Sequence, residues 1–145
     1  MSINNEFQTD ILKDIDDRIS LLEENIVYIR SIKKASPEIS KLFWKRIDEV
    51  TNHLDSYYLM IDLSELNLTE RSDPQERERG RQVLNSRKDK IKFISYIVPK
   101  NFFIRLVIKF VMNSIESFPF SIDKSITAGL KSIINFEKKN QLIII

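Results

Sequence analysis

Two near-continuous apolar runs of strand length constrain the fold of this chain more than any other feature. They are YYLMIDLS (Tyr57–Ser64) and IKFISYIVP (Ile91–Pro99). A strand with one face in water alternates apolar and polar residues, whereas unbroken apolar runs indicate strands covered on both faces. The two runs therefore predict central strands, the second of which ends at Pro99.

Segments with helical spacing alternate with these strands. SPEISKLFWKRIDEVTNHL begins with Ser36 as N-cap and Pro37 at the first helical position. SDPQERERGRQVLNSRKD has Ser72 or Asp73 as its cap, and Glu76 completes a capping-box pattern with Asp73. NFFIRLVIKFVMNSIES is almost wholly apolar, and SITAGLKSIINFEKKN is amphipathic. We expect a helix in each segment.

Three shorter strands complete the expected order of elements. RISLLEE and NIVYIRSI (Arg18–Ile32) have the pattern of two adjoining strands, and FPFSID suits an edge strand. The order predicts an α/β fold with a mostly parallel central sheet, an antiparallel strand near the N-terminus and about four covering helices. Because 145 residues with 42% apolar content suffice for one core, we expect a single domain over residues 1–145.

Composition narrows the classes of protein to consider. The chain has no cysteine, which excludes disulfides and thiolate chemistry and suits a reducing compartment. The opening MSINNEFQTDILKDIDDR is acidic and does not have the pattern of a signal peptide. The apolar segment NFFIRLVIKFVMNSI is too short to span a bilayer and is interrupted by Arg105 and Lys109. We expect a cytoplasmic protein with no transmembrane segment.

Charge is unevenly distributed along the chain. Residues 1–70 hold 8 basic and 14 acidic side chains, whereas residues 71–109 hold 11 basic and 4 acidic ones. Such a field can orient a protein partner and speed encounter. The basic residues are spread over two expected helices and a strand, without one stripe interleaved with aromatic residues, so nucleic acid is not an expected partner.

Residues suited to catalysis are sparse. His53 is the only histidine and has no partner set that spacing identifies, so we expect it at the surface. With one histidine and no cysteine, a metal site would need converging carboxylates, and no acidic pair has ion-loop spacing. Trp44 lies beside the apolar stripe of its helix as a partly buried residue or a contact residue. The sequence predicts no enzyme activity, no cofactor and no metal.

The quoted segments together resemble a known family. YYLMIDLSEL entering a helix, KFISYIVPKNFFIRLVIKFV and FPFSIDKSITAGLKSI resemble STAS-like proteins of the anti-sigma-factor-antagonist fold, in particular the small bacterial group compared with CRAL-TRIO lipid-transfer domains. The resemblance covers residues 17–135 and leaves 1–16 and 137–145 as peripheral tails. It implies a regulatory domain that binds a protein partner or kinase.

The resemblance also implies a regulatory turn after the central strand. In the family an Asp ends that strand and a serine in an Asp-Ser-Ser-Gly turn is phosphorylated, but DLSELNLTERSD departs from this pattern and has no glycine. The resemblance places the phosphorylation candidates at Ser72, Thr69 and Ser64. It places the partner-binding residues at Asp62, Glu70, Arg71 and Asp73. The simpler interpretation is that Ser72 and Asp73 only cap a helix.

The apolar helix at 101–115 has more apolar residues than one face on a sheet requires. Phe102, Phe103, Leu106 and Phe110 are its candidate contact residues. They would be buried under the N-terminal segment or the QLIII tail, lie at a homodimer contact, or line a groove for a lipid. Binding or sensing a lipid or another apolar small molecule is thus the alternative to a regulatory protein-binding domain.

Overall fold

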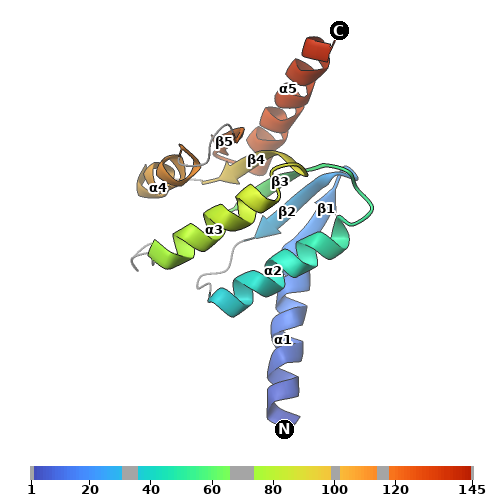
Figure 1. Ribbon diagram of the computed structural model, residues 1–145, viewed down its shortest axis with the longest axis vertical. Helices are drawn as coiled ribbons and strands as arrows, with labels where there is room; N and C mark the ends of the chain where they lie inside the picture. Colours follow the sequence, from blue (N-terminus) through green and yellow to red (C-terminus); the bar gives the residue numbers. More distant parts are fainter. Residues whose placement is uncertain (1, 31–35, 66–73, 99–101, 114–117, 145) are drawn as a thin grey trace.

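One five-stranded sheet organises the protein. The computed structural model describes residues 2–30, 36–65, 74–98, 102–113 and 118–144 (Figure 1). The strands lie in chain order across the sheet, and β1 is antiparallel to β2 while all later neighbours are parallel. Their bounds are β1 (Ile19–Leu22), β2 (Ile26–Arg30), β3 (Tyr57–Asp62), β4 (Ile91–Ile97) and β5 (Phe120–Asp123). The predicted fold class is confirmed.

Helices cover both faces of this sheet. They are α1 (Ser2–Arg18), α2 (Pro37–Val50), α3 (Pro74–Ser86), α4 (Phe102–Asn113) and α5 (Ile126–Ile144). Buried side chains of α1, α2, α3 and α4 pack into one core cluster, whereas α5 contributes to a second cluster across the sheet. Figure 1 shows α2 and α3 side by side in front of the sheet, with α5 behind it.

The central strands are buried on both faces, as their apolar sequences predict. Leu59 and Ile94 are fully buried in the cluster beneath α2, α3 and α4. Met60 and Ile97 are buried in the cluster beneath α5. Because successive side chains of a strand point to opposite faces, strands covered on both faces are apolar almost throughout, and the buried polar residue of β4, Ser95, has a hydrogen-bond partner in Asp123.

Local sequence signals define the ends of several elements. The Ser36 hydroxyl accepts a hydrogen bond from the Ile39 N–H at 3.2 Å, so the predicted N-cap of α2 is confirmed. β1 and β2 form a hairpin whose turn places Glu23 and Glu24 at φ of 50° and 72°. Turns of this hand match the right-handed twist of strands, although they favour glycine or asparagine.

The segment before β1 differs from the expectation. Residues 1–16 were expected as a peripheral tail, whereas the segment forms the helix α1 and its Ile15 is only 2% exposed. Ile11 and Ile15 are one helical turn apart and both pack on the core, which explains why a segment of net negative charge docks. α1 packs on α2, β1 and β2, while α5 runs to Ile144 and packs on β3, β4 and β5.

Candidate functional site

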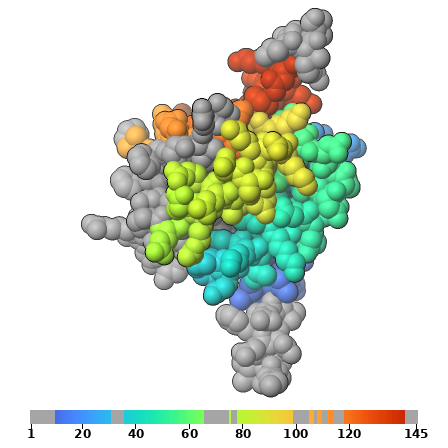
Figure 2. Space-filling view, viewed as in Figure 1, coloured from blue at the N-terminus to red at the C-terminus, as the bar shows by residue number. Residues whose placement is uncertain are grey.

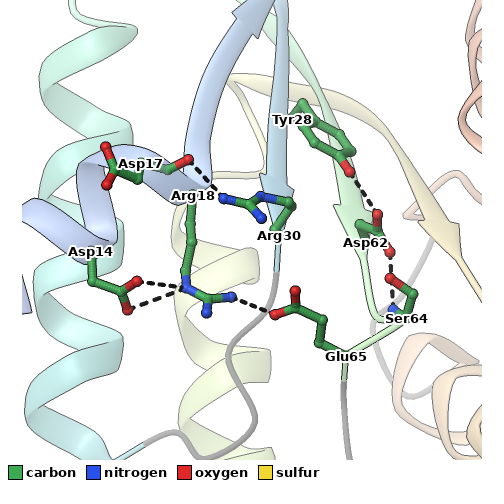
Figure 3. Close-up of polar contacts among 8 residues, drawn as sticks. All are labelled: Asp14, Asp17, Arg18, Tyr28, Arg30, Asp62, Ser64 and Glu65. Carbon is green, nitrogen blue, oxygen red and sulfur yellow. Dashed lines mark hydrogen bonds and ion pairs between the residues drawn. The ribbon is translucent and has the colours of Figure 1, made fainter.

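Asp62 ends β3 at the carboxyl edge of the sheet, where ligand sites of parallel sheets collect. The Tyr28 hydroxyl donates a hydrogen bond of 2.6 Å to Asp62 Oδ2, and the Ser64 N–H donates one of 2.9 Å to Asp62 Oδ1 (Figure 3). An Asp that accepts from the N–H two residues ahead forms a local turn, which explains why the chain leaves the sheet here. The carboxylate is held from both sides.

The same contacts set the protonation of this pair. Burial alone would raise the pKa of Asp62, but hydrogen bonds from Tyr28 and Ser64 and the nearby Arg30 charge outweigh it and lower that pKa. Burial, together with the hydrogen bond to Asp62, raises the pKa of Tyr28 to about 12. Asp62 is therefore an anion and Tyr28 a neutral donor across the physiological range of pH.

A network of charges continues from this pair along the edge. Arg18, the last residue of α1, pairs with Asp14 at 3.2 Å and with Glu65 at 2.8 Å. Arg30, the last residue of β2, donates to the Asp17 carbonyl oxygen at 3.1 Å. Figure 3 shows that these contacts join the end of α1 to the edge formed by β2 and β3 and to the turn after β3. The hydrogen bond to Glu65 is the main reason that the pKa of Arg18 is raised.

The predicted regulatory turn is described only in its first residues. Asp62 lies at the end of β3 as expected, and Ser64 is exposed just beyond it. The remaining phosphorylation candidates and partner-binding residues lie outside the described residues: Ser72, Thr69, Glu70, Arg71 and Asp73. The arginine network around Glu65 was not predicted, because Arg18 and Glu65 are 47 positions apart and meet only when α1 docks.

The apolar helix predicted at 101–115 is α4, which ends at Asn113. Ile108 and Met112 are buried in the core beneath it, whereas Leu106 is 48% exposed. The side chains of Phe102, Phe103 and Phe110 lie outside the described ones. α4 therefore contributes to the core, and Leu106 is the candidate contact residue that the structure places at the surface.

A second polar cluster, absent from the sequence-based predictions, lies between the sheet and α5. Asp123, the last residue of β5, accepts hydrogen bonds from the hydroxyls of Ser95 and Ser121 at 2.6 Å each and of Ser132 at 2.8 Å. A Cβ added at Gly129 would lie 2.7 Å from Ser95 Oγ, so glycine permits this close approach of α5. The carboxylate is occupied by three donors, and the cluster fixes α5 on the sheet.

Other site classes find little support in the described part of the chain. His53 is exposed. Among the described residues, no three or more His, Cys, Asp or Glu side chains are grouped so that they could hold a metal ion. None of the helices, as far as they are described, combines the length and the apolar character that crossing a bilayer requires.

Comparison with known proteins adds no relative: no family model matches the chain, and no curated protein or solved structure is significantly similar to it.

Proposed function

We propose that this chain is a cytoplasmic, non-enzymatic regulatory domain of the STAS-like type, and that a protein partner docks at the carboxyl edge of β2 and β3. The observation that carries the proposal is the permanence of the charges there. The pKa of Asp62 is lowered and that of Arg18 is raised, while the pKa of Tyr28 rises to about 12. Each of these three pKa values is shifted further from neutral pH.

Permanent charges suit recognition better than proton transfer. A general acid or base works best with a pKa near the operating pH, and these groups have the opposite property. The hydrogen bonds to Asp62 and the ion pairs of Arg18 also hold these side chains in place. Charges fixed in position give a partner its orientation and its specificity.

The fold supports the STAS-like part of the proposal. The resemblance rests on an order of strands and helices with an Asp at the end of the central strand, and β3 ends at Asp62. A phosphate on the exposed Ser64, or in the turn that follows, would add about 1.5 to 2 negative charges beside Asp62 and Glu65. An acidic partner surface would then be repelled, and binding would weaken.

Charge reversal at opposite ends of the sheet tests this function. Arg30 is exposed at the carboxyl end of β2, and Lys92 is exposed near the amino end of β4, so Arg30→Glu and Lys92→Glu are matched in charge and differ in place. Each tagged variant is expressed in the native host, crosslinked in cells and analysed by quantitative mass spectrometry. We expect a partner that is lost with Arg30→Glu and retained with Lys92→Glu.

Two outcomes would contradict the proposal. If both variants retain the same crosslinked proteins as the unaltered chain, the edge is not the docking surface. If Ser64→Ala and Ser64→Glu bind the partner equally, and mapping finds no phosphate from Ser64 to Ser72, regulation by phosphorylation is wrong while docking at the edge still stands. Circular dichroism of each variant controls for loss of the fold.

A further inference from the structure

An open cleft of about 810 Å³ separates the facing sides of α2 and α3. Figure 2 faces this side of the molecule, with α2 in cyan to green and α3 in yellow-green. Trp44 of α2 and Val83 of α3 supply apolar surface, and both are only partly buried. The volume lies in the range of known ligand sites, which are mostly apolar with a few charged groups.

Small side chains leave this space unfilled. Gly80 lies on the α3 wall, and a Cβ added there would meet no atom within 4 Å. Ser40 and Ser86 also line the cleft with short side chains. Since glycine inside a helix costs about 1 kcal/mol relative to alanine, Gly80 weakens α3 at a position where a larger side chain would fit.

One cation of the cleft is fully engaged within the protein. The Arg87 guanidinium lies 4.8 Å from the centroid of the Trp44 ring and donates to both Asp48 oxygens, at 2.7 and 3.0 Å. The hydrogen bond to Asp48 is the main reason that the pKa of Arg87 is raised. This pair holds the indole in place, and its charges cancel.

The remaining charge of the cleft is positive. Glu49 pairs with Arg46 at 3.1 Å, so both carboxylates that line the cleft, Asp48 and Glu49, have partners. Lys41, Lys45 and Arg79 also line the cleft, and none of the three forms an ion pair with another described residue. A ligand that fits would bring negative charge to these cations and an apolar group to Trp44.

The spacing of Lys41, Lys45 and Arg79 favours a helical ligand over a small anion. Lys41 and Lys45 are one turn apart along α2, about 6 Å, and Arg79 stands on the opposite wall. The lining residues of α2 run from Pro37 to Glu49, about 18 Å along the helix. A small anion needs cations that converge on one point, whereas a helix presents carboxylates and apolar groups at one-turn spacing.

We propose that the cleft between α2 and α3 binds an acidic amphipathic helix of a protein partner. The apolar face of that helix packs on Trp44 and Val83 and enters the space left by Gly80. Its carboxylates face Lys41, Lys45 and Arg79. The residues that line this cleft do not include those of the polar network at the carboxyl edge, and the proposal does not depend on the function proposed for that edge.

Binding of designed peptides by the full chain tests the proposal. The probe is a fluorescein-labelled, capped helical peptide of about 16 residues with leucines and one phenylalanine on one face and glutamates on the other. The control peptide carries lysine in place of every glutamate. In fluorescence anisotropy we expect the acidic peptide to bind at least about tenfold more tightly than its control, with an affinity that falls as salt rises.

Two protein variants locate the site. Lys41→Glu combined with Lys45→Glu should weaken the acidic peptide at least about tenfold, whereas Lys92→Glu should not. Gly80→Leu should fill the cleft and also weaken binding at least about tenfold, while its midpoint of thermal unfolding stays equal or rises because leucine favours helix over glycine.

Several results would overturn the proposal. They are equal affinity for the acidic and lysine peptides, unchanged binding by Gly80→Leu, and tighter binding of a labelled single-stranded DNA of similar length. If sedimentation shows that this chain is a dimer and that Gly80→Leu is a monomer, the cleft is instead a contact between two copies of the chain. Weaker binding by both cleft variants together with normal binding by Lys92→Glu supports the proposal.

Discussion

Removing the hydroxyl of Tyr57 should stabilise the protein. Tyr57 is 1% exposed, and its hydroxyl has no hydrogen-bond partner among the described residues. A buried polar group without a partner costs about 1–3 kcal/mol, and the phenylalanine ring leaves packing unchanged. We expect Tyr57→Phe to raise the free energy of unfolding by about 1 kcal/mol.

Tyr28→Phe supplies the matched comparison. Its hydroxyl donates to the Asp62 carboxylate at 2.6 Å, and a hydrogen bond to a charged group contributes about 1.5–3 kcal/mol. Because Tyr28 is only partly buried, we expect a loss near the lower end of that range. The same atom deleted from two tyrosines should therefore change stability in opposite directions.

Urea denaturation measures both variants. At an unchanged m-value, the midpoint concentration reports the change in stability. A gain of about 1 kcal/mol corresponds to roughly 2–4 °C in the midpoint of thermal unfolding for a chain of this size. Thr51 is the control, because its side chain lowers the pKa of Tyr57 as a hydrogen-bond donor would, although its hydroxyl donates to the Ile47 carbonyl oxygen at 2.6 Å. A double-mutant cycle with Thr51→Val should show no coupling.

A loss of more than about 1 kcal/mol in Tyr57→Phe, or clear coupling to Thr51, would refute the reasoning, because it would mean that the hydroxyl has a stabilising partner.

Three further predictions concern stability. Because the pKa of Asp62 is lowered in the folded protein, its carboxylate contributes stability that is fully present above the ordinary pKa of 3.8 and is lost as pH falls through the folded pKa. The free energy of unfolding, measured as a function of pH, should therefore fall less on acidification in Asp62→Asn than in the unaltered protein. Gly129→Ala should destabilise by about 1–3 kcal/mol in urea denaturation, and Ser95→Ala should partly rescue it; full tolerance of the added methyl would contradict the packing at Ser95. Ile94→Ala should cost about 2–5 kcal/mol, and amides of β3 and β4 should exchange slowest with deuterium; a cost below about 1 kcal/mol, or fast exchange there, would refute their central position.

The strands and their order along the chain could be predicted from the sequence because the necessary signals are local. The apolar runs of β3 and β4 and the cap at Ser36 each depend on neighbouring residues only. α1 was missed because its apolar residues are few, although Ile11 and Ile15 carry the one-turn spacing that packs it. Docking of this segment depends on a narrow apolar stripe on one side of the helix.

The polar sites could be predicted only in part, because they depend on register and helix rotation. Ser121 and Asp123 are two residues apart and so share a face of β5, a signal that the sequence contains. Their meeting with Ser95 requires the pairing of β4 with β5. Likewise, Arg87 reaches Asp48 across 39 positions only when α2 and α3 lie on the same face.

The strand order of the sheet bears on how the chain reaches its fold. From β2 to β5 each strand pairs with the one before it in the sequence, so no strand must be inserted between two that have already paired. Low separation between paired segments favours fast folding, and synthesis releases the N-terminal segments first. We expect the nascent chain to extend the sheet from one edge as each strand emerges from the ribosome, with α5 sealing the second face last.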